Sequence, residues 1–330
     1  MQRPFAVALV VAFPHLCAGT WRRQNDTSLT TSYRSCPFMM ARYMEGGEST
    51  CEDGRFFAWE GRVGSTENRS TAAYYAGDAS VLDGRRIVFM GDSLTRQHFV
   101  AAACRLYAEG APLLDSRAAF EAHRNSNRSS FLKTAAATFA GVALVLDADA
   151  GAEGLEAYAT AQCGALGARD VLVLNQGAHY SADHRRYAAA VESAFRAIGL
   201  LKKVGGCPAT VFWRETAPNH FASGVWHGKG TCHDRTATQD KALRGSGLYP
   251  ALNRAAATAA RANGLFLLKV YQKSLSAGAA AHVGGGGGGG GGKSDDCLHW
   301  CLPGVPDLWT LELLLKLAAV DRIRAAGEPG

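Results

Sequence analysis

Two segments far apart in the chain carry residue types that together perform acyl transfer. The first is Gly91-Asp92-Ser93, and the second, near the C-terminus, contains Asp296 and His299. A serine hydroxyl attacks an ester only when a hydrogen-bonded base removes its proton. Asp296 and His299 stand three residues apart, so one helical turn or tight loop places both on one side, where the carboxylate fixes the imidazole tautomer. The pattern predicts Ser93 as nucleophile, His299 as base and Asp296 as its orienter.

The elements around Ser93 favour this chemistry. The apolar run Ile87–Met90 precedes Ser93 and a helix-like stretch, Leu94–Ala108, follows it. Ser93 is therefore predicted where a strand turns into a helix. The unpaired N–H groups and the positive dipole at a helix start stabilise the oxyanion formed when a serine attacks an ester. Gly-Asp-Ser alone has the composition of an ordinary turn, and only its pairing with Asp296 and His299 favours catalysis.

Apolar strands alternate with helical patterns along most of the chain. The predicted strands are Ile87–Met90, Val142–Leu146, Val171–Leu174, Thr210–Trp213 and Leu265–Val270, and Tyr187–Lys202 has a helical apolar face. This alternation predicts an α/β fold whose mostly parallel sheet lies between two layers of helices. Sites of such sheets lie at the carboxyl ends of the strands. Asn175 follows one strand, so its amide is a candidate oxyanion donor, with a turn asparagine as the equal alternative.

The composition describes a globular protein of an oxidising compartment. Of 330 residues, 47% are hydrophobic and 19% charged, and the net charge of +6 comes without the clustered basic and aromatic residues of a nucleic-acid binder. Nine cysteines indicate disulfides. Candidate N-glycosylation sites lie at Asn25, Asn68 and Asn127. The apolar stretch within residues 1–16 is shorter than a spanning helix of about 20 residues, so it is predicted as a signal peptide or a truncated signal anchor.

Two further regions are distinguished by composition. Residues 17–83 are polar and lack periodic apolar runs, so we expect an irregular minor lobe held by disulfides before a catalytic lobe over residues 84–330. The run Gly284–Gly292 consists of glycine alone and cannot pack a core. It is predicted to be a disordered surface insertion without a chemical role.

Longer motifs spread over nearly the whole chain resemble one family. They are Cys17 with Gly19-Thr20-Trp21, Cys36-Pro37-Phe38, Gly91-Asp92-Ser93, Trp213-Arg214-Glu215-Thr216-Ala217-Pro218-Asn219-His220-Phe221, Gly224-Val225-Trp226, Gly230-Thr231-Cys232, and the string from Asp296-Cys297-Leu298-His299-Trp300-Cys301 to Trp309. The chain resembles the plant trichome birefringence-like polysaccharide O-acetyltransferases, in the PC-esterase group of SGNH/GDSL-like proteins. A cysteine that the family usually places after the region of Trp59 is missing, which leaves Cys17 without its customary partner.

The resemblance implies an SGNH-like fold, a Golgi location, and transfer of acetyl groups to cell-wall polysaccharide through acetyl-Ser93. It implies no bound cofactor and an acetyl donor, such as acetyl-coenzyme A, as co-substrate. The expected partners are the donor and the polysaccharide, with no nucleic acid, possible membrane anchorage through the N-terminus, and a monomeric protein. Secretion is the alternative location.

Further site residues are carried over from the resemblance. It implies the disulfides Cys36–Cys104, Cys51–Cys301 and Cys232–Cys297. Whether Cys163 and Cys207 form a further pair is not decided by the sequence. Arg214 and His220 are candidates for support or sugar binding, against a strand-end arginine and a loop histidine. Trp226 is the tryptophan favoured for stacking on a sugar ring, over Trp213 and Trp300.

Three competing interpretations stay open at this point. An acetyl esterase uses the same residues with water as acceptor, because acceptor choice depends on groove contacts and water exclusion. A noncatalytic carbohydrate-binding protein of the same fold is disfavoured by the intact Ser93, Asp296 and His299. A zinc site at Cys297, His299 and Cys301, with Cys232-His233, matches no common spacing, and no metal is expected.

Overall fold

The computed structural model describes twelve stretches of the chain, and the account below is confined to them. They are residues 19–25, 27–39, 51, 55–62, 68–70, 79–122, 130–147, 154–180, 183–222, 231–234, 249–284 and 296–326. Residues 1–16, Asn127, Trp226 and most of the glycine run lie outside these stretches. Within them, no helix is both long enough and apolar enough to cross a membrane.

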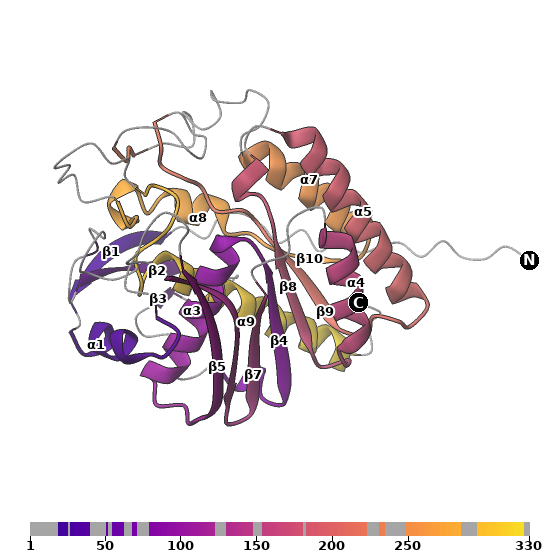
Figure 1. The fold of residues 1–330 in the computed structure, drawn as a ribbon, viewed down its shortest axis with the longest axis horizontal. Coiled ribbons are helices and arrows are strands. Elements are labelled where there is room, and N and C mark those ends of the chain that lie inside the picture. Colours follow the sequence, from indigo (N-terminus) through magenta and orange to yellow (C-terminus); the bar gives the residue numbers. More distant parts are fainter. Residues whose placement is uncertain are drawn as a thin grey trace, which may run out of the picture.

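A seven-stranded sheet forms the centre of the molecule (Figure 1). Its spatial order is β10 (Phe266–Leu268), β9 (Thr210–Arg214), β8 (Val171–Asn175), β4 (Arg85–Gly91), β7 (Val142–Asp147), β6 (Ser130–Phe139) and β5 (Leu113–Ala122). The five strands from β10 to β7 pair in parallel, and β6 and β5 add an antiparallel hairpin at one edge. The predicted mostly parallel α/β sheet is confirmed, and each of the five predicted strands is present.

Helices cover both faces of this sheet, because its central strands are apolar on both sides. Every residue of β8 is buried, as expected for a strand between two helical layers. Helices α4 (Leu155–Ala165), α5 (His184–Lys203) and α7 (Tyr249–Ala262) pack side by side, and α3 (Ser93–Ala108) packs with α9 (Val305–Ala325). Shorter helices accompany them, namely α8 (Tyr271–Leu275), η2 (Ala79–Leu82), η4 (Ala178–Tyr180) and η5 (Ala279–Ala281).

The N-terminal lobe is more regular than its composition predicts. β1 (Gly19–Asn25), β2 (Arg55–Arg62) and β3 (Asn68–Ser70) form a three-stranded antiparallel sheet, accompanied by α1 (Thr27–Ser35). The apolar alternation is weak in this segment, and the pairing between β1 and β2 joins residues that are 30 positions apart at Asn25 and Arg55 and 42 apart at Gly19 and Gly61, which no local pattern reveals. The lobe is attached to the larger sheet domain by the Cys36–Cys104 disulfide and by a hydrogen bond from the Tyr33 hydroxyl to the Asp307 carboxylate.

Candidate active site

Ser93 occupies the turn between β4 and α3. β4 ends at Gly91, Asp92 is the N-cap, and Ser93 is the first helical residue. The Asp92 carboxylate accepts a hydrogen bond from the Leu94 N–H at 3.0 Å, so the first turn of the helix is capped by a side chain. Ser93 itself is only partly buried. Its hydroxyl therefore stands at the carboxyl edge of the sheet, where the strand and helix pattern places it.

Gly91 makes the sharp turn before Ser93 possible. Its φ of +150° is rarely adopted by residues with a side chain, and a Cβ at this position would stand 1.7 Å from the Asn175 carbonyl oxygen. The backbones of β4 and β8 therefore approach each other closely at this point. No other residue type fits position 91 without moving one of the two strands.

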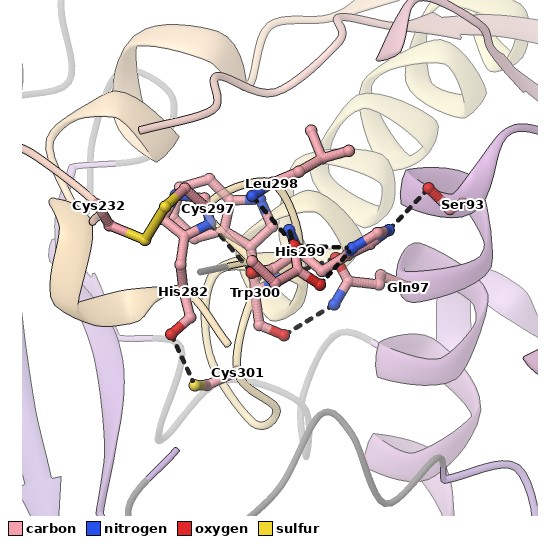
Figure 2. A network of polar contacts seen from close by, with 10 residues as sticks. Ser93, Gln97, Cys232, His282, Cys297, Leu298, His299, Trp300 and Cys301 are labelled. Carbon is pink, nitrogen blue, oxygen red and sulfur yellow. Dashed lines mark hydrogen bonds and ion pairs between the residues drawn. A yellow bond between two sulfur atoms is a disulfide. The ribbon is translucent and has the colours of Figure 1, made fainter. Parts of the chain in front are cut away.

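Ser93, His299 and Asp296 form a continuous chain of hydrogen-bonding contacts. Figure 2 shows the contact between Ser93 and His299. The Ser93 Oγ is 2.8 Å from His299 Nε2, and His299 Nδ1 is 2.8 Å from Asp296 Oδ2. A carboxylate beside Nδ1 keeps the proton on that nitrogen and leaves Nε2 free to accept a proton. The three side chains that the sequence pairs are thus brought together in the order that nucleophilic catalysis requires.

A local turn holds Asp296 and His299 in register. The second carboxylate oxygen of Asp296 accepts hydrogen bonds from the backbone N–H groups of Leu298, at 3.2 Å, and His299, at 3.0 Å. Asp296 therefore fixes both the backbone and the imidazole of His299. The three-residue spacing therefore allows one carboxylate to reach both the backbone N–H and the ring of His299.

Long-range contacts attach this turn to the rest of the protein. Gln97, one helical turn after Ser93, donates to the Trp300 carbonyl at 2.7 Å and accepts from the Trp300 N–H at 3.1 Å. The two disulfides that bracket the turn are Cys51–Cys301 and Cys232–Cys297, and the structure also contains Cys163–Cys207. The pairs Cys51–Cys301 and Cys232–Cys297 are the ones that the resemblance implies, and Cys163–Cys207 is the pair that the sequence left undecided. Cys232, Cys297 and Cys301, which a zinc site would require as thiolates, are thus engaged in disulfides.

Asn175 differs from the prediction, because its amide hydrogens are donated to groups at the end of β9. The amide nitrogen donates to the Arg214 carbonyl at 2.9 Å and to Thr216 Oγ1 at 3.2 Å, which uses both of its hydrogens. The side chain is fully buried. In this structure Asn175 joins the ends of β8 and β9 and is not an oxyanion donor.

Asp92 is the carboxylate that the sequence patterns overlook. Besides capping α3, it accepts hydrogen bonds from the N–H groups of Gly177, at 3.2 Å, and Ala178, at 3.0 Å. The turn between β4 and α3, which carries Ser93, is thereby joined to the loop after β8. The sequence could have indicated this role, because an acidic residue directly before a predicted helix is a strong N-cap pattern. Here that helix starts at the candidate nucleophile, Ser93.

For Arg214 and His220 the sugar-binding interpretation is wrong, because neither side chain is accessible to a sugar, whereas the supporting interpretation stands. Both side chains are fully buried. Arg214 donates to Asn175 Oδ1 at 2.6 Å and its guanidinium carbon lies 4.3 Å from the centre of a Trp309 ring. Burial lowers the pKa of Arg214 to about 10, and the negative charge of Asp92 opposes that shift. Arg214 therefore supports the strand ends as a buried cation.

The remaining candidates fall into two groups. Trp213 and Trp300 are fully buried and are core residues, whereas Trp226 lies outside the described residues. Asn25 is the last residue of β1, and Asn68 is the first residue of β3. Asn127 lies outside the described residues. The N-glycosylation of these three asparagines stays a prediction.

Shortening the glycine run is expected to leave activity intact. The Gly284 N–H donates to the Asp296 carbonyl at 3.0 Å, so the two ends of the intervening segment are already joined. Halving a loop changes its closure free energy by only about 0.6 kcal/mol. We expect deletion of residues 286–290 to keep turnover within about twofold and the free energy of unfolding within about 1 kcal/mol.

The matched contrast is Val283→Pro, which removes the N–H that donates to the His299 carbonyl at 3.0 Å. Denaturant unfolding and assays of Ser93 acylation on both variants make the comparison. Loss of activity in the deletion variant would assign the glycine run a function.

Stability is expected to fall in mild acid because buried histidines remain neutral. His98 packs edge-on against Phe89 and Trp309, and burial together with the Arg214 cation lowers the pKa of His98 well below its ordinary value. Below about pH 6.5 the histidine is protonated in the unfolded chain but not in the folded chain. Each such histidine therefore lowers the free energy of unfolding by up to about 1.4 kcal/mol per pH unit.

The variant that tests this expectation is His98→Phe, which suits the aromatic surroundings. Urea unfolding between about pH 6.5 and 5 should show a flatter pH dependence than in the wild type. Burial raises the pKa values of Glu215 and Asp307, and these groups act in the opposite direction at lower pH. An identical slope in His98→Phe and the wild type would contradict the assignment.

Known proteins provide three comparisons. Residues 168–317 match the family model described as PC-Esterase, a GDSL/SGNH-like acyl-esterase family found in Pmr5 and Cas1p. Protein trichome birefringence-like 1 of Arabidopsis thaliana is 26% identical over 286 residues, covering 72% of this chain and 50% of that protein. Xyloglucan O-acetyltransferase 4 of Populus trichocarpa is 28% identical over 149 residues, covering 42% and 35%. The chain spans half or less of the length of these relatives.

A solved structure gives a weaker likeness. A provisionally assigned SGNH hydrolase from Slackia heliotrinireducens is 18% identical, with a TM-score of 0.37, covering 72% of this chain and 98% of that one. The fold assignment here rests on the strand order of the chain itself. The family match includes Asp296 and His299 and begins after Ser93.

Proposed function

The chain carries a PC-esterase domain and is a relative of the trichome birefringence-like proteins, and from this premise we propose that it transfers acetyl groups to polysaccharide hydroxyls. The observation that carries the proposal is the contact chain from Ser93 Oγ through His299 to Asp296. A relative named for xyloglucan O-acetylation supports a polysaccharide as the acceptor class. The protein acts in the secretory pathway, with the Golgi as its expected compartment, and functions as a monomer.

The first half-reaction acetylates the enzyme. His299 Nε2 accepts the Ser93 hydroxyl proton while Oγ forms a bond to the carbonyl carbon of the acetyl donor. Collapse of the tetrahedral intermediate expels the donor's leaving group, which receives the proton from His299. The backbone N–H of Ser93, at the positive end of α3, supplies an oxyanion donor. The product is acetyl-Ser93.

The second half-reaction passes the acetyl group to the acceptor. A sugar hydroxyl gives its proton to His299 and attacks the acetyl carbon, the bond to Ser93 Oγ breaks, and Ser93 recovers the proton. Asp296 keeps the Nδ1–H tautomer in both steps. The donor is a co-substrate with an activated acetyl group, such as acetyl-coenzyme A, and no cofactor is permanently bound.

A second candidate is a carbohydrate acetyl esterase, which the acyl-esterase description of the matching family favours. The two activities differ only in whether a sugar or a water molecule attacks acetyl-Ser93. Incubation of the purified protein with an acetyl donor and a panel of oligosaccharides separates them. Mass spectrometry that finds acetylated sugar supports the transferase, and free acetate alone supports the esterase. If neither acetylated sugar nor free acetate forms with any oligosaccharide of the panel, the proposal is overturned and the noncatalytic interpretation is left.

A further inference from the structure

The segment immediately before the glycine run pairs with the loop that carries Asp296 and His299. The Val283 N–H donates to the His299 carbonyl at 3.0 Å, and the Gly284 N–H donates to the Asp296 carbonyl at 3.0 Å. The two residues proposed as base and orienter are therefore both held through their backbones. Residues 281–284 form a support that lies behind the catalytic loop.

His282 adds its side chain to this support (Figure 2). It is fully buried, and its Nδ1 lies 3.0 Å from the same His299 carbonyl. Its ring stacks on Trp300, with ring centres 3.7 Å apart and an interplanar angle of 30°. Its Nε2 lies 2.6 Å from Nδ1 of His220, whose Nε2 is 3.3 Å from the Leu275 carbonyl. Two buried imidazoles thus form a line between two carbonyl oxygens.

The contacts determine the tautomers of the two neutral rings. A carbonyl only accepts, and two nitrogen lone pairs at 2.6 Å repel, so each of the three contacts requires a proton, whereas two neutral rings supply only two. The contact left without a proton is the longest one, from His220 Nε2 to Leu275 at 3.3 Å. His220 then donates from Nδ1 to His282, and His282 donates from Nδ1 to the His299 carbonyl.

A third proton would satisfy all three contacts but would bury a charge. Burial is the main cause that lowers the pKa of His282 well below its ordinary value, and the neighbouring His220 adds to that shift. The other groups that influence His282 are the His299 backbone and ring and the Asp296 carboxylate. This shift keeps the His282 ring neutral at about pH 7.

We propose that His282 is a positioning residue for the catalytic base: its Nδ1–H fixes the backbone of His299, its stack on Trp300 makes a smaller contribution, and His220 selects the required tautomer. The inference rests on the proposed function for its consequence in turnover. Its structural content concerns only how His299 is aimed at Ser93. A small displacement of a catalytic group is enough to lower rates by about 100-fold.

Three substitutions separate the components of this role. His282→Asn retains a donor at the Nδ1 position and loses the ring. His282→Phe retains the stack on Trp300 and loses both nitrogens. His282→Gln retains a polar atom toward His220 and loses the Nδ1 donor. We expect the Phe and Gln variants to lower kcat about 10- to 100-fold with KM within about threefold, and the Asn variant to recover most of that loss.

The reaction of Ser93 with a fluorophosphonate measures the same alignment without any sugar or acetyl donor. We expect the labelling rates to follow the order wild type, Asn, then Gln and Phe. Wild-type labelling in a folded Phe variant would overturn the inference while leaving the proposed function intact. Slowed labelling in a protein that acetylates no sugar would overturn the proposed function and retain the inference.

Histidine nitrogen NMR of the wild-type protein covers the case in which the variants do not fold. The expected spectrum has His282 protonated at Nδ1 and bare at Nε2, with His220 protonated at Nδ1. A proton on His282 Nε2 would overturn the proposed tautomer and, with it, the positioning role.

Discussion

Ser93→Ala is expected to abolish acetyl transfer, lowering kcat by about 10⁶-fold, and to eliminate any acetylated enzyme. The reason is that the Ser93 Oγ, 2.8 Å from His299 Nε2, is the atom proposed to form the covalent bond to the acetyl group. The methyl group of alanine cannot form this bond. A water molecule in the place of the hydroxyl would attack the donor directly, without an acetylated enzyme. Turnover assays and intact-protein mass spectrometry after brief exposure to the donor measure both effects.

The matched control is Ser193→Ala, on the exposed face of α5, where the lost hydroxyl donates to the Glu156 carboxylate. That variant should keep wild-type turnover and a comparable melting temperature. Ser93→Ala should also remain folded, because it removes one partly buried hydroxyl. Full activity in a folded Ser93→Ala protein would contradict the mechanism.

Asp296→Asn is expected to lower kcat by about 10⁴-fold through the tautomer of His299. Asp296 Oδ1 accepts from the backbone N–H groups of Leu298 and His299, so the asparagine carbonyl is held in that position. Its NH₂ then occupies the place of Oδ2, 2.8 Å from His299 Nδ1. Two donors cannot face each other, so Nδ1 must give up its proton and Nε2 must carry it, which prevents Nε2 from accepting the Ser93 proton.

The control for this substitution is Asp183→Asn, at the N-cap of α5, where asparagine caps as well as aspartate. It should leave both stability and turnover unchanged. Single-turnover acetylation of Asp296→Asn would report the rate of serine attack directly. A loss of less than tenfold would show that the carboxylate does not fix the tautomer.

Local patterns in the sequence were sufficient to place Ser93. A buried apolar strand, a glycine, an N-cap aspartate and a helical stretch occupy consecutive positions, and each acts on its immediate neighbours. The spacing of Asp296 and His299 is equally local, since one turn brings the carboxylate to both the imidazole and the backbone of His299. The parallel strands were predictable for the same reason, because burial on both faces leaves continuous apolar runs.

Long-range competition for hydrogen bonds decided the residues that the sequence misassigned. Asn175 follows a strand, as an oxyanion donor would, yet the Arg214 carbonyl and Thr216 hydroxyl take both of its amide hydrogens. Arg214 reads as an exposed strand-end cation, but the Trp309 face and Asn175 allow it to be buried. Those partners come from distant parts of the chain, so no local pattern announces them.

The sequence by itself determined which residues are candidates for the chemistry, and the tertiary structure decided their alignment. Ser93, Asp296 and His299 are recognisable because residue type and short spacing are those of a nucleophile, an orienter and a base. Their 2.8 Å contacts depend on Gln97, on two disulfides and on the support behind the loop, which includes His282. Hydrogen bonds act only over a few ångströms, so groups hundreds of residues apart become partners only after the chain has folded.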